Sequence, residues 1–485
     1  MRESKKNSIA MNILHLFYST ALSSVLNATA LIVLAYYLKS YDYGMFSVVL
    51  AFAMIMGYFT DAGLSTIVLR EGSKKKMDIS ILISSYVKMR MVLLFATFIC
   101  GFIVIHISNS GNKELIQTAY YLVIPMVLGI ALQSIGTTFF QMIEKMQYYG
   151  MIRILSSVCL VLTLSVGIYF SLSPLIITTL YGLSYFAGGV FGVYLVNRNV
   201  KIRLKSKFHK GLLQNLGSFT LGGLLFVMLP HLGPLVLEKT VTLEEVGLFA
   251  VAYRIPQALQ QIPFIIAGAY YPVLFRSFNN NLLDDHLRYN ISLIKIMALV
   301  GMAMTIPFFY MSNVVIHLLF GDRWIHASFP LKILSLMLTL QAINIALADG
   351  LTTRGLQSLR TTIQSIAVIS GGILYLYLSK SFGVTGAAFT GVMIEGIALV
   401  GFWICIPNRW VIAKKAICPY LSFFIIGLGS IEFFLNSHPL LAVVFHFLLL
   451  VLVLFIDKEF KNIIYDYLKI RIIGYKWKTK KSQGV

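Results

Sequence analysis

Charged side chains inside long apolar stretches are the residues of this sequence most able to do chemistry. Asp61 lies in the stretch from Tyr43 to Arg70, YGMFSVVLAFAMIMGYFTDAGLSTIVLR, and Arg254 lies in a second one. A charge at the centre of a lipid-spanning helix costs about 2.5–3.5 kcal/mol on insertion scales, so it usually faces a partner or a water-filled cavity. These side chains therefore predict a polar binding site inside an apolar protein.

Arg254 and Asp61 each allow more than one role. Arg254 could bind a phosphate through two hydrogen bonds of its guanidinium fork, or it could snorkel to the outer headgroups. Asp61 could be the counter-charge of a basic cavity residue, with Arg254 as a candidate, or a proton or cation site. It could also be a structural carboxylate that caps a bend at Ala62-Gly63.

Three further candidates complete the predicted cavity lining. His231 stands in Pro230-His231-Leu232-Gly233-Pro234 and could titrate near physiological pH or simply pack. Glu395 is interpreted as a protonated carboxyl bonded to a neighbour, or as a cavity acid. Lys295, near the end of its stretch, is expected to snorkel or to line the cavity mouth. The same two alternatives apply to three basic residues near the cytoplasmic face, Lys88, Arg90 and Arg153.

The elements that must hold these residues follow from composition. The chain has 485 residues, of which 58% are hydrophobic and only 12% charged, against about 25% charged in a soluble domain. Apolar runs of about 20 residues, long enough to span a bilayer, recur along the chain. Each such run must be helical, because lipid offers no hydrogen-bond partner to an open backbone. We predict an all-α polytopic membrane protein with about fourteen spans: Met11–Leu38, Tyr43–Leu69, Ser84–Ile107, Gln117–Gln141, Gly150–Phe170, Pro174–Asn197, Gln214–Leu237, Val246–Leu274, Ile291–Met311, Phe329–Leu351, Thr361–Ser379, Val384–Pro407, Val411–Leu435 and Pro439–Ile456.

The Lys and Arg residues support this count. Alternate gaps between spans hold 27 of the 40 basic residues, the intervening gaps hold 5, and the other 8 lie inside spans. The positive-inside tendency then puts both termini in the cytoplasm. It also accounts for most of the +21 net charge without any nucleic-acid partner, because the cations are dispersed rather than gathered in one module.

Two segments echo each other along the chain. YGMFSV at Tyr43–Val48 returns as VGLFAV at Val246–Val251, a shift of 203 residues. We therefore expect two parallel six-helix repeats followed by two extra helices. The predicted boundaries are 1–198 for the first lobe, 199–213 for a basic linker, 214–410 for the second lobe, 411–456 for the extra pair and 457–485 for a basic tail that lies on the membrane surface as an interfacial helix.

Other functional classes find little support in the sequence. The gaps between spans are too short for a globular domain, and no Walker A, GxGxxG, HExxH or CxxC motif occurs. The four cysteines fall within spans and do not have metal-ligand spacing. We expect a transporter that is not an enzyme and has no bound cofactor or metal.

Four stretches together resemble one family. They are YLKSYDYGMFSVVLAFAMIMGYFTDAGLSTIVLRE, with its Asp61-Ala62-Gly63 turn and terminal Arg70-Glu71; VGLFAVAYRIPQALQQIPFIIAGAYYPVLFR, with Tyr253-Arg254; HLLFGDRWIHASFPLKILSL; and SFGVTGAAFTGVMIEG. Their order and spacing are similar to those of the O-antigen and capsular polysaccharide flippases, which belong to the multidrug/oligosaccharidyl-lipid/polysaccharide (MOP) exporter superfamily.

The resemblance implies a fold and an activity. The fold is a V-shaped pair of six-helix lobes around a central cavity. The activity is translocation of undecaprenyl-pyrophosphate-linked glycan to the outer leaflet of the cell membrane. The implied partners are the lipid-linked oligosaccharide, membrane lipids, a polysaccharide polymerase and glycosyltransferases, and coupling to a proton or sodium gradient stays open. A cation-coupled exporter of small amphipathic molecules is the alternative. A membrane-embedded polymerase or ligase is disfavoured, because it would need a long external loop.

Overall fold

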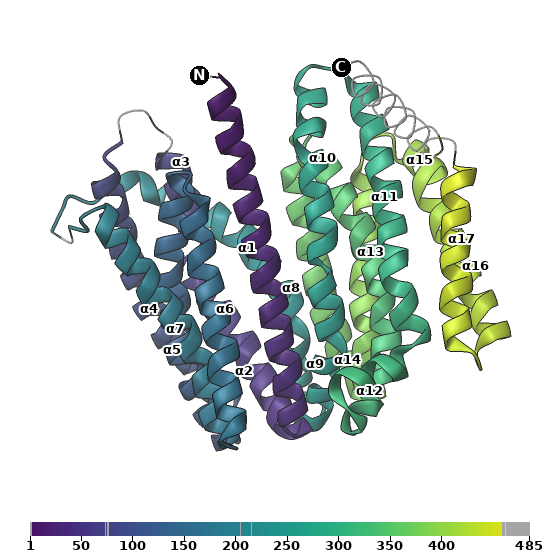
Figure 1. The fold of residues 1–485 in the computed structure, drawn as a ribbon, viewed down its shortest axis with the longest axis horizontal. Helices are drawn as coiled ribbons and strands as arrows, with labels where there is room; N and C mark the ends of the chain where they lie inside the picture. The colour runs from purple at the N-terminus through teal and green to yellow at the C-terminus, as the bar shows by residue number, and fades with distance from the viewer. Residues whose placement is uncertain are drawn as a thin grey trace, which may run out of the picture. The chain divides into compact units, whose positions relative to one another are not determined.

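The computed structural model describes residues 2–457 and 461, except 73, 75, 76, 204 and 215. The described residues form helices and no strand, which confirms the predicted fold class (Figure 1). The elements are α1 (Arg2–Tyr37), α2 (Ser40–Phe59), α3 (Leu64–Gly72), α4 (Ile79–Ser108), α5 (Lys113–Met142), α6 (Met146–Tyr169), α7 (Pro174–Asn199), η1 (Lys210–Leu213), α8 (Leu216–Leu237), α9 (Leu243–Leu259), α10 (Gln261–Asn279), α11 (Leu283–Tyr310), α12 (Ser312–Phe320), η2 (Asp322–Ala327), α13 (Ser328–Thr352), α14 (Gln357–Cys405), α15 (Arg409–Ile412), η3 (Ala413–Ile417), α16 (Cys418–Leu435) and α17 (Pro439–Ile456).

The helices account for the predicted membrane spans. Within the described residues, twelve helices are long and apolar enough to cross a bilayer. One of them, α14, has a kink at Gly383, where φ is 56° and ψ is −140°. The kink divides α14 into two helices that match the predicted spans 361–379 and 384–407. The predicted span 214–237 corresponds to α8, so each of the fourteen expected spans has a helix.

Two predicted spans are interrupted where the sequence contains turn or helix-breaking residues. The second span is divided into α2 and α3 by Ala62 and Gly63, whose φ angles are 48° and 81°. The eighth span is divided into α9 and α10 at Gln260, in a segment that holds Pro256 and Pro263. The seventh span is not interrupted, because α8 runs through both Pro230 and Pro234. Each proline removes one backbone donor, and a helix tolerates this loss where a neighbour or a cavity satisfies the freed carbonyl.

The chain forms two compact units, and each is described by itself. Unit 1 comprises Met1–Ala258, Ile316–Pro330 and Thr361–Ile394, and unit 2 comprises Leu259–Val315, Leu331–Arg360 and Glu395–Val485. In unit 1, α5 packs along α7 and α2, and α6 packs on α1 and α7. In unit 2, α11 packs against α10, α16 and α17. Each unit is a set of residues that pack together, from several parts of the chain. The boundaries predicted from the sequence divide the chain into consecutive repeats, and they stay predictions. Apart from Asp457 and Lys461, the predicted interfacial tail lies outside the described residues.

The two echoing segments pack against each other within unit 1. A Cβ atom placed on Gly44 in α2 would lie 1.8 Å from the carbonyl oxygen of Leu243 in α9. A Cβ placed on Gly247 would lie 2.3 Å from the carbonyl oxygen of Ser40. Gly44 and Gly247, like Ser40 and Leu243, are related by the same shift of 203 residues, so the contact is reciprocal, as expected for two copies of one repeat. The glycines allow the two backbones to approach each other this closely.

This contact predicts an effect of methyl groups at the crossing. Gly44→Ala and Gly247→Ala should each lower the free energy of unfolding by about 1–3 kcal/mol, because an overpacked contact forces backbone shifts. Thermal unfolding of the purified protein in detergent measures this. Gly372→Ala is the matched control, since a Cβ there meets nothing within 4 Å and alanine favours a helix. An unchanged melting temperature in Gly44→Ala would contradict the close approach.

Candidate functional site

A polar cavity of about 470 Å³ lies within unit 1, among α2, α3, α4, α5, α6 and α8. Its lining includes three of the residues that the sequence offered for a cavity, Asp61, Arg90 and His231. The other lining residues are Met54, Gly57, Tyr58, Ser65, Ile130, Ser134, Thr137, Thr138, Gln141, Tyr149, Val227 and Pro230. Hydroxyl, amide, imidazole and charged groups therefore meet in a part of the protein that is otherwise apolar.

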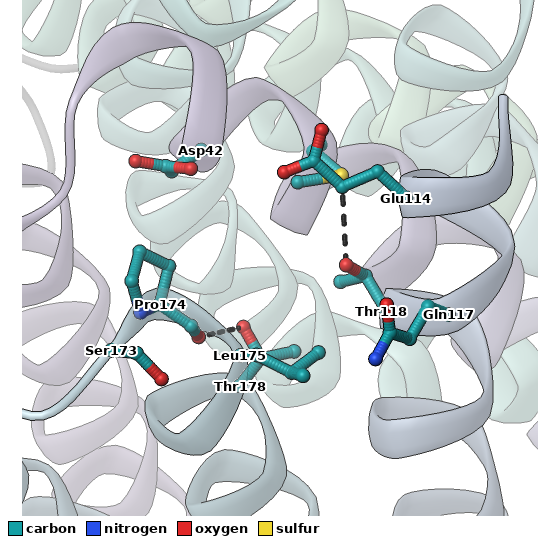
Figure 2. Close-up of a pocket in the computed structure, with 9 residues that line it drawn as sticks. Asp42, Glu114, Gln117, Thr118, Ser173, Pro174, Leu175 and Thr178 are labelled. Carbon is teal, nitrogen blue, oxygen red and sulfur yellow. Dashed lines mark hydrogen bonds between the residues drawn. The ribbon is translucent and has the colours of Figure 1, made fainter.

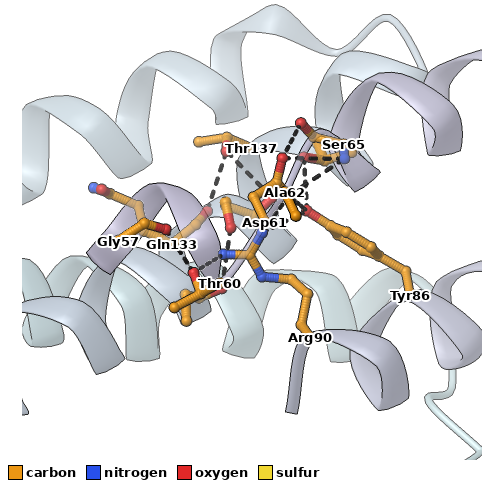
Figure 3. Close-up of polar contacts among 12 residues, drawn as sticks. Gly57, Thr60, Asp61, Ala62, Ser65, Tyr86, Arg90, Gln133 and Thr137 are labelled. Atoms are coloured by element: carbon orange, nitrogen blue, oxygen red, sulfur yellow. Dashed lines mark hydrogen bonds and ion pairs between the residues drawn. The ribbon is translucent and has the colours of Figure 1, made fainter. Parts of the chain in front are cut away.

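Asp61 is held at the break between α2 and α3. Its carboxylate accepts hydrogen bonds from the Ser65 hydroxyl at 2.7 Å and from the Ser65 backbone N–H at 3.3 Å. It thereby caps the first turn of α3, where backbone donors lack helical partners. Asp61 therefore has the predicted capping role, and the same carboxylate also forms an ion pair (Figure 3).

The charge partner of Asp61 is Arg90 of α4, not Arg254. Arg90 Nη1 forms an ion pair with Asp61 Oδ1. Arg90 Nη2 donates to Thr60 Oγ1 at 3.0 Å, and the Tyr86 hydroxyl donates to Asp61 Oδ1 at 3.0 Å. Figure 3 shows the guanidinium and the Tyr86 ring converging on the carboxylate from α4.

The burial of Arg90 excludes one of its two predicted roles, snorkelling to the membrane surface. Its side chain is only 1% exposed, so it does not snorkel; it lines the cavity instead. Its Nε atom is buried and has no hydrogen-bond partner among the described residues. A buried ion pair costs desolvation of both ions, and removing one partner leaves an uncompensated charge. The pair therefore links α4 firmly to the turn that separates α2 from α3.

Arg254 lies on α9, outside the lining of this cavity, and is partly buried. Its Nη1 donates to Gln257 Oε1 at 2.9 Å, and its Nε donates to the Tyr43 hydroxyl at 3.4 Å. The Nη2 atom of Arg254 has no hydrogen-bond partner in the part of the chain that the structure describes. Its predicted contact with substrate is untested.

The remaining two predicted site residues belong to unit 2, and each has a protein partner. Glu395 accepts a hydrogen bond from Asn344 Nδ2, at 2.8 Å to Oε2. Lys295 forms an ion pair with Asp457 at 2.9 Å, and the Tyr420 hydroxyl also donates to Asp457, at 2.9 Å. Lys295 thus connects α11 to the end of α17. Their roles as cavity residues stay predictions.

Sequence reasoning missed the anchor formed by Trp324. This residue of η2 is fully buried in unit 1, and its indole N–H donates to the Ala35 carbonyl at 2.9 Å. Its ring meets the ring of Tyr43 edge-on, with 5.5 Å between centroids. Tyr43 is also the residue that accepts from Arg254. A lone Trp in the short segment FGDRW was the only sequence signal for this contact.

A second cavity, of about 290 Å³, also lies in unit 1 at the first turns of α2, α5 and α7. Asp42 and Glu114 are its two carboxylates, together with Gln117, Ser173 and Thr178 (Figure 2). Acidic groups in a first turn complement the helix dipole, and this explains the placement of both. Across the described residues, no group of three or more His, Cys, Asp or Glu side chains could hold a metal ion.

The Asp61–Arg90 pair predicts strong coupling between two variants. Asp61→Asn and Arg90→Gln should each destabilise the protein by about 3–5 kcal/mol, because each leaves one charge buried without its partner. The double variant should lose much less than the sum of the two. Thermal unfolding of the two single variants and the double variant in detergent measures this coupling as a double-mutant cycle. Asp285→Asn, which breaks an exposed ion pair with Arg288, is the control and should have little effect on stability. Strictly additive losses would show that the two charges do not depend on each other.

Comparisons with known proteins address the family and the fold. The family model described as "Polysaccharide biosynthesis protein" matches residues 9–278, more than half of the chain. No curated protein matches the chain. The chain is similar to the solved structure of the lipid II flippase MurJ in an inward-closed conformation, with a TM-score of 0.70 and 14% identity, covering 91% of this chain and 99% of that one.

Two transporters of the MOP superfamily have the same fold. An inward-facing multidrug resistance MATE family transporter matches with a TM-score of 0.68 and 16% identity, covering 81% of this chain and 95% of that one. A MOP superfamily transporter from Pyrococcus furiosus matches with a TM-score of 0.59 and 15% identity, covering 84% and 96%. At these identities the likeness establishes the fold alone. The chain is a multi-pass membrane protein of the polysaccharide biosynthesis protein family and has the fold of MOP superfamily transporters.

Proposed function

We propose that this protein is a flippase that moves undecaprenyl-pyrophosphate-linked oligosaccharide from the inner to the outer leaflet of the cell membrane by alternating access, for surface polysaccharide assembly. The observation that carries the proposal is the family match over residues 9–278 in a chain that holds a polar, charged cavity among membrane-spanning helices. The similarity to a lipid II flippase supports a lipid-linked substrate. Both termini are proposed to be cytoplasmic, from the distribution of basic residues.

The cavity suits the physical problem of moving a glycan through lipid. A sugar carries many hydroxyl groups, and each one that enters lipid without a partner costs several kcal/mol. Ser134, Thr137 and Gln141 on α5 offer donors and acceptors along one face of the cavity, and Tyr149 adds a ring with a polar end. Because the Asp61–Arg90 pair is already neutral overall, it makes the site polar without adding net charge.

The diphosphate linker needs a cation, and Arg254 is our candidate. In contrast to Arg90, it has no carboxylate partner among the described residues. Its planar fork matches a phosphate bidentately. Tyr43 and Gln257, which accept from Nε and Nη1, would set the orientation of the fork. His231, which lines the cavity, is proposed as a hydrogen-bonding neighbour of the head group.

The second candidate function is export of small amphipathic molecules coupled to a cation gradient. The specific observation in its favour is the fold similarity to a multidrug resistance transporter, over 81% of this chain. Coupling to a proton or sodium gradient is part of both proposals. The two differ in what accumulates when the protein is lost.

Deletion of the gene should trap the lipid-linked oligosaccharide in the inner leaflet. We expect the lipid-linked pool to rise severalfold and the surface polysaccharide to fall, in a strain with no second flippase, as measured by lipid extraction and polymer staining. The same strain complemented with the wild-type gene is the control. Normal surface polymer together with new sensitivity to amphipathic compounds would reject the flippase and favour the exporter.

The complementation assay also tests the role given to Arg254. Arg254→Lys keeps the charge but loses the planar fork, so it should restore polymer only in part. Arg254→Ala should restore little, at wild-type protein levels. Arg276→Ala, which removes a basic residue at the end of α10, is the matched control and should complement fully. Full polymer in Arg254→Ala would leave the diphosphate without its proposed partner while the flippase proposal itself still stood on the deletion result.

A further inference from the structure

The segment between α7 and η1 is a fixed part of unit 1 rather than a loose linker. We define the cationic strap as residues 200–210, of which 204 is outside the described residues. The Ser80 hydroxyl donates to the Lys201 carbonyl at 2.9 Å, and the Arg203 backbone N–H donates to the Ser84 hydroxyl at 2.8 Å.

The second half is held by one hydroxyl, one ammonium group and one buried carboxylate. The His209 backbone N–H donates to Ser85 Oγ at 3.0 Å, and Lys88 Nζ donates to the Ser206 carbonyl. The His209 ring lies 3.0 Å from Glu71 Oε2, and the Glu71 side chain is only 1% exposed. The partners from α4 are Ser80, Ser84, Ser85 and Lys88, whose spacing puts them on one face of its first turns. The strap is therefore hydrogen-bonded to α4 at four positions along its length.

This docking separates the side chains of the strap into two sets. Val200 and Ile202 are partly buried against the hydrophobic core of unit 1. The cations point the other way, and all five of them are exposed: Lys201, Arg203, Lys205, Lys207 and Lys210. Residues 198–214 contain no Asp or Glu, so no acidic residue within the segment offsets this charge. The one buried acid nearby, Glu71, is already paired with His209, Lys74 and Arg70.

The surroundings of the strap are those of a membrane–water boundary. The strap follows directly after α7, whose last turns carry Tyr194, 54% exposed, with Arg198 above its ring at 5.8 Å. Aromatic residues and Arg gather at this level of membrane proteins. Phe208 is exposed among the cations of the strap, an amphipathic combination that suits the headgroup region.

We propose that the cationic strap is a docking surface for the phosphate groups of anionic phospholipids. A cluster of four to eight basic residues beside a membrane helix attracts anionic headgroups. Here the backbone is held in place by α3 and α4, so the cations meet the headgroups without the ordering cost that a loose loop would pay. The surface is separate from the cavity and does not depend on which substrate is transported.

The test uses the purified full-length protein in vesicles, with the four native cysteines replaced by serine. Phe208→Cys carries a fluorescent label, and quenching by brominated phosphatidylglycerol is compared with quenching by brominated phosphatidylcholine. We expect phosphatidylglycerol to quench severalfold more strongly. Replacing Lys201, Arg203, Lys205 and Lys207 by Gln should bring the ratio close to one, since each lost cation lowers the preference by up to about fivefold.

Two controls make the result decisive. Replacing Lys145, Arg409, Lys414 and Lys415 by Gln removes the same charge from exposed positions outside the strap, and the ratio should then stay near that of the parent protein. High salt should abolish the preference of the parent protein, because exposed charges are screened. An equal loss in both four-residue variants, or a preference that survives high salt, would overturn the proposal.

Discussion

The burial of one ion pair at a helix break is the constraint on which the rest of unit 1 depends. Asp61 must cap α3, and Arg90 must find a partner for a guanidinium that is almost fully withdrawn from solvent. Neither charge can exist alone at this depth without a large free-energy cost. Together they hold α2, α3 and α4 at one point, and this point forms a wall of the polar cavity. A polar site inside a membrane protein is stable here because its most expensive groups satisfy each other.

A second constraint operates where the two echoing segments meet. Gly44 and Gly247 let α2 and α9 approach backbone to backbone, and the reciprocal distances to Leu243 and Ser40 show that the echoing segments contact each other. Tyr43, beside Gly44, then packs against Trp324 and accepts a hydrogen bond from Arg254. The residue that we propose for the diphosphate is thereby connected to the crossing of α2 and α9 through the side chain of Tyr43.

The sequence predicts the helices well and their polar partners poorly, for a physical reason. Hydropathy and turn-forming residues are local properties of the sequence, so the spans and the bend at Ala62-Gly63 could be predicted from them. The partner of Asp61 could not, because Arg90 lies in the next span, close to a helix end, where snorkelling is the ordinary outcome. The Trp324 in FGDRW could not indicate its partners, since a tryptophan between two predicted spans becomes an anchor only through the tertiary fold. The continuous α8 shows that two prolines predict lost hydrogen bonds but not whether the surroundings compensate for them.

The central claim is that the polar cavity of unit 1 is wet and receives the head of a lipid-linked glycan. The most direct measurement is the reaction rate of a cysteine at Thr137, a lining residue, with a charged thiol reagent in a cysteine-free background. Ala119→Cys, at a packed position of the same helix, is the control and should not react. The account predicts that Thr137→Cys reacts and that undecaprenyl-pyrophosphate-linked oligosaccharide slows this reaction severalfold. A cysteine that does not react, or that reacts at the same rate with saturating substrate, would contradict it.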